Sequence, residues 1–147
     1  MLCSLEEILK YENAPVVKRF QKDFPAKADR AEDLFKDLLR FFWGTKKHEI
    51  ERSRQPAAEE LDFVFIMDEE MREIDQMWHV FLLYTRDYAD FCQRHFGEYL
   101  HHQPDLVPIF EKGGFRFETN LEKFLNYNFD LFGEKVIRRW FAASVAQ

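Results

Sequence analysis

Apolar residues recur at spacings of three and four along most of the chain, which is the pattern of helices that bury one face. A broad apolar face over residues 29–43 predicts a main core helix, and Gly44 fits the position that ends it. The most regular apolar stripe, at residues 74–82, consists of Ile74, Met77, Trp78, Phe81 and Leu82. Further helical stretches cover residues 5–9, 16–20, 88–95, 120–131 and 136–141. We therefore predict an all-α protein, with a single compact helical domain over residues 1–147 and roughly six helices.

Two short segments carry strand-like patterns. Residues 61–67 are almost wholly apolar and rich in Phe, Val and Ile, which fits either a buried strand or the approach to a helix. Gly113 and Gly114 precede an alternation of Phe115 and Phe117 that is typical of a brief extended piece. The two segments could pair, so we expect at most a minor two-stranded element.

A two-helix core unit is predicted at about residues 69–104. Thr85 offers a hydroxyl of the kind that caps the start of a helix, and Gly97 suits a left-handed helix end. Pro104 prevents the chain from continuing as a helix. The unit should therefore consist of two helices joined by a short corner near Thr85.

Four side chains of metal-binding character fall within this unit. Asp75 and His79 stand four residues apart on one helix, which makes their side chains neighbours. Cys92 lies about as far after the corner as His79 lies before it, and His102 follows the second helix. Antiparallel packing of the two helices would bring all four together. Imidazole, thiolate and carboxylate are the ligands that zinc and similar divalent transition metals select, so the four are candidate metal ligands.

Three functions fit this cluster. We favour a buried, hydrogen-bonded polar core in a binding or structural module, because satisfied polar groups are common in cores. The alternative is a metal site made by His79, Cys92 and His102, with Asp75 as a ligand or as the support of His79, and with His101 as a substitute for His102. The third is a hydrolase or transferase in which Cys92 acts with a histidine. A thiol among aromatic residues inside a helix has a raised pKa and is therefore a poor nucleophile. The enzyme hypothesis is the weakest of the three.

The spacing within the core unit resembles a known family. The residues that carry the likeness are Asp75, Trp78, His79, Thr85, Tyr88, Cys92, Gly97, His102 and Pro104. Their pattern, D-x-x-W-H, Y-x-x-x-C and G-x-x-x-H-H-x-P, is similar to the core repeat of the glycine-rich domain-containing protein-like family and to bacterial proteins of the same arrangement. The resemblance implies a helical unit with a His and Cys cluster of unproven purpose. This chain lacks the long glycine-rich tract of the plant members, so no function of that tract is transferred.

Composition limits the classes of partner and the cellular compartment that we expect for the protein. Twenty-seven acidic and 21 basic residues give a net charge of -6, which disfavours binding to nucleic acid. Two cysteines, Cys3 and Cys92, suit a soluble protein of the reducing cytoplasm, and no apolar run approaches the roughly 18 residues of a membrane span. The charged run at residues 46–55, which includes His48, is interpreted as a solvated helix or linker. This run, or the basic and aromatic residues 135–141, could bind an acidic protein partner, and the oligomeric state is left open.

Overall fold

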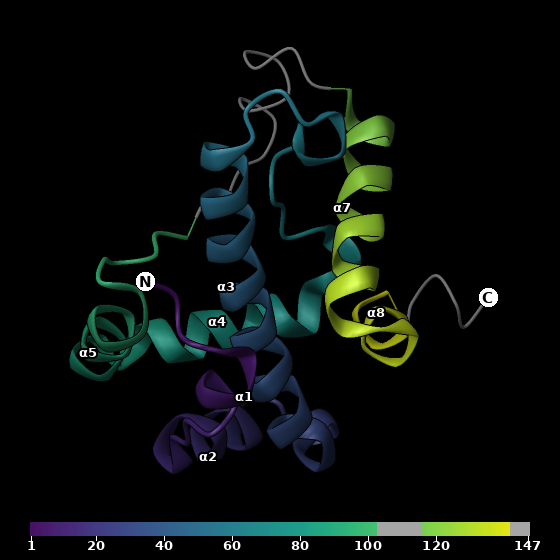
Figure 1. Ribbon diagram of the computed structural model, residues 1–147. Coiled ribbons are helices and arrows are strands. Elements are labelled where there is room, and N and C mark those ends of the chain that lie inside the picture. Colours follow the sequence, from purple (N-terminus) through teal and green to yellow (C-terminus); the bar gives the residue numbers. More distant parts are fainter. Residues whose placement is uncertain (103–115, 142–147) are drawn as a thin grey trace.

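The computed structural model describes residues 1–102 and 116–141, and these residues form seven α-helices and no strand (Figure 1). The α-helices are α1 (Leu5–Ile8), α2 (Ala14–Asp23), α3 (Ala31–Arg54), α4 (Arg72–Leu83), α5 (Thr85–Phe96), α7 (Phe117–Phe132) and α8 (Glu134–Trp140). Short 3-10 helices lie between them at η1 (Pro25–Arg30), η2 (Glu59–Leu61) and η3 (Glu69–Met71). The prediction of an all-α protein is confirmed. None of the helices in the described ranges has the length and apolar character that crossing a membrane requires.

The long helix α3 runs through the middle of the molecule, and α4 crosses it (Figure 1). α3 also contacts α1, α2 and α7, so helices from the N-terminal and the C-terminal parts of the chain pack against it. The core between α3 and α4 includes Leu38, Phe42, Met77 and Phe81, all of which are fully buried or nearly so. The apolar stripes predicted for these two helices therefore face each other.

Gly44 does not end α3, contrary to the prediction. The helix continues to Arg54, and a Cβ atom at position 44 would lie 3.0 Å from Phe65 Cζ and 3.2 Å from Asn128 Oδ1. Glycine at this position therefore allows two other segments to approach the helix closely, which is a different use of the residue from a helix end.

The charged run at residues 46–55 belongs to the same helix, and it is not fully solvated. Lys46 and His48 are buried. The Nε2 atom of His48 lies 2.9 Å from the carbonyl oxygen of Leu61, and its ring packs on Phe63. Burial lowers the pKa of His48. The interpretation as a helix is thus confirmed up to Arg54, and the expectation that the run merely faces water is wrong for these two residues.

Residues 61–67 are held by a side chain of α7 and form no strand. The amide of Asn120 accepts a hydrogen bond from the Val64 N–H at 2.7 Å and donates one to the Val64 carbonyl at 3.0 Å. It thus satisfies both backbone groups of Val64, as a neighbouring strand would otherwise do. The partner strand predicted at Gly113 to Phe115 lies outside the described residues, and Phe117 begins α7.

Replacing Asn120 by alanine is expected to lower the free energy of unfolding by about 2–4 kcal/mol, because two backbone groups lose their partners in a partly buried position. Urea unfolding followed by circular dichroism measures the change. Asn126→Ala is the matched control, since Asn126 is exposed on the same helix and its loss should cost no more than about 0.5 kcal/mol. Equal effects of the two substitutions would contradict the role of Asn120.

Candidate metal centre

Asp75 and His79 lie one turn apart on the side of α4 that reaches solvent. The Nε2 atom of His79 is 3.7 Å from Asp75 Oδ2. Trp78, the neighbour of His79, is turned into the core and is only 6% exposed. The amphipathic pattern of α4 therefore places a carboxylate and an imidazole together at the boundary of its buried face, as the four-residue spacing predicts.

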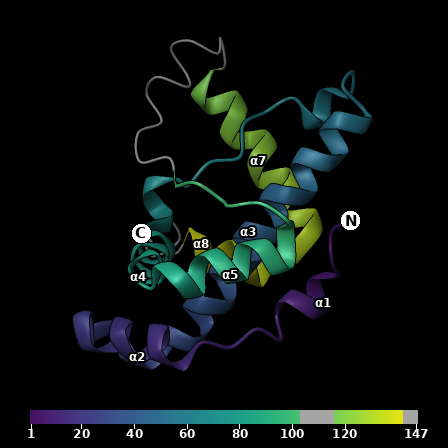
Figure 2. The same ribbon diagram turned by 90° about the vertical axis from the view of Figure 1, so that its left-hand side faces the viewer.

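The corner between α4 and α5 is short and lies next to Thr85, as predicted. Tyr84 alone separates the two helices and occupies the N-cap position of α5. Thr85 is already helical, and no side chain caps the start of α5. Gly97 ends α5 with a φ of 73°, which confirms the predicted left-handed position. Figure 2 shows the segment after Gly97 running back from the end of α5 toward the side of the molecule where α4 lies.

Tyr88 fixes the path of this returning segment. Its hydroxyl accepts a hydrogen bond from Trp78 Nε1 at 3.0 Å and donates one to the Leu100 carbonyl at 2.6 Å. Tyr88 is fully buried, and burial raises the pKa of its phenol. The segment is thus anchored to both helices two residues before His102. The carbonyl of Leu100 could not be identified from the sequence, because every residue carries such a group.

His102 completes a cluster of three with Asp75 and His79. Its Nε2 atom lies 2.6 Å from Asp75 Oδ1, and its ring centre is 4.7 Å from that of His79. Trp78 borders the cluster on one side, because its ring centre lies 4.3 Å from that of His102. One ligand atom from each of the three residues can be chosen so that all lie within 4.8 Å of one another. In residues 1–102 and 116–141, no other group of three or more His, Cys, Asp or Glu side chains converges in this way.

The three side chains differ in exposure. His102 is 12% exposed, Asp75 29% and His79 57%, so the cluster opens to solvent on the His79 side. The preferred sequence interpretation, a buried polar core, does not describe this cluster well. An ion could reach it from solvent and would meet two imidazoles and one carboxylate, which is a ligand set that binds divalent transition metals. We call Asp75, His79 and His102 the triad.

Cys92, the fourth candidate, does not converge with the triad. It is fully buried on α5, and burial is the largest influence on its thiol, whose pKa it raises. The Leu100 backbone lowers the pKa of the thiol and offsets the effect of burial only in part. The thiol is therefore part of the buried core around Tyr88, and its raised pKa disfavours a nucleophilic role. His101 is exposed, and its ring packs against Tyr99.

Iodoacetamide should fail to alkylate Cys92 in the folded chain, with or without a metal chelator, and should alkylate it in urea, because burial and a raised pKa protect the thiol. Mass spectrometry of the cysteine peptides gives the extent of reaction. Cys3, which is only partly buried, serves as the internal control and should react faster. Alkylation of Cys92 that begins only when a chelator is added would contradict its placement outside the triad.

Comparison with known proteins places the chain in a family. The model of the UCP032817-like family matches residues 10–112, which is more than half of the chain and includes the whole triad. The chain belongs to the UCP032817-like family. No curated protein and no solved structure matches the chain. The UCP032817-like match does not confirm the resemblance to glycine-rich domain-containing proteins, which stays a prediction.

Proposed function

We propose that this protein binds one divalent transition metal ion, such as zinc, through Asp75, His79 and His102. The observation that carries the proposal is the convergence of the three ligand atoms within 4.8 Å. In a tetrahedral site with bonds of about 2.0 Å, neighbouring ligand atoms are about 3.3 Å apart. The Nε2 atom of His102 lies 2.6 Å from Asp75 Oδ1, and the Nε2 atom of His79 lies 3.7 Å from the other carboxylate oxygen, Oδ2, so the two distances lie on either side of this value.

Three protein ligands would leave a fourth position of the metal free for water or another small molecule, which is the arrangement of reactive rather than structural zinc sites. Two histidines and one carboxylate are also the ligand set of non-haem iron(II) sites. The ligand types therefore support a metal site. The measured affinities for zinc and for iron(II) would distinguish the two metals. Cys92 is not needed for this proposal.

The second candidate function is structural, and the short contact between His102 and Asp75 favours it. At 2.6 Å this hydrogen bond ties the segment after α5 to α4 without any ion. Asp75→Asn separates the two proposals, because asparagine keeps the shape and an oxygen acceptor and loses the negative charge. A metal site predicts that this variant folds as well as the parent and binds zinc more weakly. A purely structural contact predicts no zinc binding by either protein.

The direct test is a calorimetric titration of the full chain, stripped of metal, with zinc and separately with iron(II) under anaerobic conditions. The expected result is saturable binding of one equivalent, with a melting temperature that rises as the free zinc concentration increases. Affinity should weaken on acidification, because protons compete with the metal for the imidazole nitrogens. A folded chain that binds neither ion at millimolar concentration would refute the metal site and leave the structural function.

A further inference from the structure

The helices α7 and α8 border a groove of about 460 Å³ beside the η3 turn. Its volume falls within the range of ligand-binding sites. The apolar residues that line it are Leu121, Leu125 and Phe129 of α7 and Ile137 and Phe141 of α8. Residues of the triad do not line the groove, so it is distinct from the proposed metal centre. It therefore calls for a separate explanation.

The groove residues of α7 form a second apolar stripe beside the face of the helix that packs in the core. The buried residues recur every four positions from Asn120 to Asn128, and each residue of the second stripe follows one of them. We call Leu121, Leu125 and Phe129 the outer stripe. Its members span about 12 Å along the helix axis. Phe129 is 49% exposed, so the core does not cover the end of this stripe.

The opposite wall of the groove is formed by α8. Ile137 and Phe141 stand one turn apart, and Phe141 is only 8% exposed. Apolar side chains at four-residue spacing on both sides of a groove are suited to an amphipathic helix, whose own anchors recur at three and four positions. The spacing of the walls thus indicates a helical occupant rather than a small molecule.

Glutamates flank the outer stripe on α7. Glu118 and Glu122 are exposed, and each stands three residues before a leucine of the stripe. Residues three apart are neighbours on a helix surface, so both carboxylates lie beside the stripe. Lys123, the only lysine or arginine of α7, donates a hydrogen bond to the Asp62 carbonyl instead. This edge of the groove is therefore acidic.

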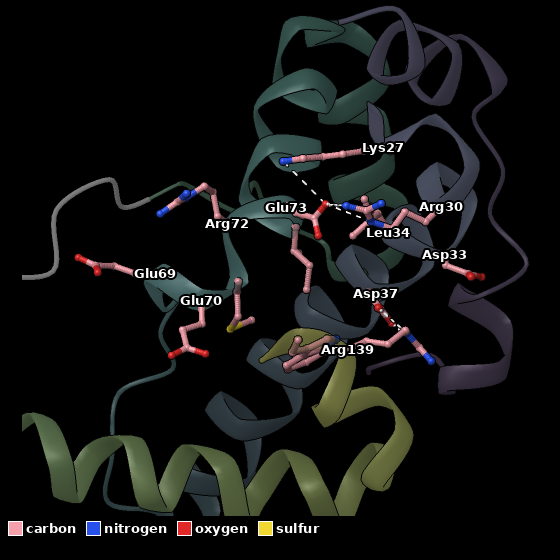
Figure 3. A pocket seen from close by; sticks show the side chains of 13 residues that line it. Lys27, Arg30, Asp33, Leu34, Asp37, Glu69, Glu70, Arg72, Glu73 and Arg139 are labelled. Atoms are coloured by element: carbon pink, nitrogen blue, oxygen red, sulfur yellow. Dashed lines mark hydrogen bonds and ion pairs between the residues drawn. The ribbon is translucent and has the colours of Figure 1, made fainter. Parts of the chain in front are cut away.

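Two further carboxylates line the groove from the side of η3. They belong to Asp68 and Glu70, and Figure 3 shows the Glu70 side chain extending toward α7. Burial raises the pKa of Asp68, and the neighbouring carboxylates of Glu70 and Glu69 raise it further. The acidic groups at this end thus repel one another, and a cation brought close to them would reduce that repulsion.

The arginines of α8 do not cancel this negative charge. Arg138 lines the groove and donates a hydrogen bond to Glu134 at 2.8 Å, so the two form a neutral pair. Arg139 is turned away and forms an ion pair with Asp37 at 2.8 Å in a neighbouring cavity of about 410 Å³ (Figure 3). Lys135 stands one turn before Arg139 and does not line the groove. These positions favour a basic partner over the acidic one considered from the sequence.

We propose that the groove between α7 and α8 binds an amphipathic helix of a partner protein, with apolar anchors at three- and four-residue spacing and lysine or arginine beside them. The outer stripe and α8 would bury the anchors, and the carboxylates around the groove would face the cations. A second copy of this chain fits less well, because each copy carries a net charge of -6 and the acidic edges would meet. The proposal does not depend on the metal centre.

Three labelled peptides of about 18 residues, or about five helical turns, test the proposal. The first has leucine at every third or fourth position, lysine beside the leucines and alanine elsewhere. The second has glutamate in place of lysine, and the third has the composition of the first in an order without helical periodicity. Fluorescence anisotropy with the full chain measures their affinities.

The first peptide is expected to bind saturably and to bind more weakly as the salt concentration rises, because salt screens the attraction between charges. The other two should bind at least about 10-fold more weakly, since one brings like charges together and the other cannot align its anchors. Equal binding of the first and third peptides would show attraction by charge alone and would overturn the proposal. Failure of the first peptide to bind would also overturn it.

Phe129→Ala removes the exposed anchor of the outer stripe and should weaken binding of the first peptide roughly 5- to 30-fold, as loss of an aromatic contact at an interface does. Leu83→Ala is the matched control, because Leu83 is 59% exposed on α4 outside the groove, and its affinity should equal that of the parent. Equal affinities of the two variants would contradict the site. If Phe129→Ala does not fold, the comparison of the three peptides on the parent protein decides.

Sedimentation of the parent protein and of Phe129→Ala distinguishes the partner helix from a second copy. The proposal predicts that both sediment as the same species. A parent dimer that the Phe129→Ala substitution dissociates would identify a second copy as the occupant of the groove and would overturn the proposal.

Discussion

Replacing His79 by alanine is expected to lower the affinity for zinc by at least about 100-fold, because even a residue that only supports a ligand contributes about 10- to 100-fold. The metal-free variant should melt within about 2 °C of the parent, since a substitution at an exposed position changes stability by no more than about 0.5 kcal/mol. His79 is 57% exposed and packs little against the core, which makes it the most informative member of the triad. Competition titration against a zinc chelator measures the affinity, and differential scanning calorimetry measures the melting temperature.

His101→Ala is the matched control for this experiment. His101 is an exposed histidine next to His102, and its ring packs against Tyr99. Its removal should leave zinc affinity unchanged. Equal losses in the two variants would mean that zinc binds loosely to neighbouring histidines, and no loss in either would exclude His79 as a ligand.

Replacing Trp78 by alanine is expected to lower the free energy of unfolding by about 3–5 kcal/mol, the cost of a cavity left by a large aromatic side chain. Trp78 is 6% exposed, and its ring packs against Phe41 and Phe42 of α3. It also forms the wall behind His102, so zinc affinity should fall in the same variant. Urea unfolding and the zinc titration give the two quantities.

Trp78→Phe separates the packing of the ring from its hydrogen bond. It keeps an aromatic ring against α3 and removes the Nε1–H that donates a hydrogen bond to the Tyr88 hydroxyl. It should therefore lower the free energy of unfolding by less than the alanine variant does, by about 1–3 kcal/mol. An alanine variant that unfolds at the same urea concentration as the parent would show that Trp78 does not hold α4 against α3.

The helices were predictable because their evidence is local. The three- and four-residue spacing of apolar side chains locates α4, and the positive φ of Gly97 is the conformation that only glycine adopts easily. The proximity of Asp75 and His79 follows from the same periodicity. These features require no knowledge of distant parts of the chain.

The features that the sequence did not reveal depend on distant contacts. Gly44 lies inside α3, where Phe65 and Asn128 approach it closely, and Asn120 of α7 holds the backbone of Val64. No periodic pattern identifies such pairs.

Cys92 shows the limit of an argument from helix length alone. Equal distance from the corner can place two residues at the same level of an antiparallel pair, but it does not fix which side of each helix they occupy. Cys92 shares the buried face of α5 with Tyr88, one turn away, whereas His79 lies on the side of α4 that reaches solvent. His102 joins Asp75 because Tyr88 anchors the segment after α5 at Leu100.

X-ray absorption at the zinc edge of the zinc-loaded full chain tests the proposed metal centre most directly, because it reports the atoms bound to the ion. The triad predicts nitrogen and oxygen ligands at about 2.0–2.1 Å, with the outer-shell scattering of two imidazole rings and no sulfur. A sulfur ligand at about 2.3 Å would place Cys92 on the metal, and a spectrum without imidazole scattering would exclude the histidines. Either of these results would contradict the proposed centre.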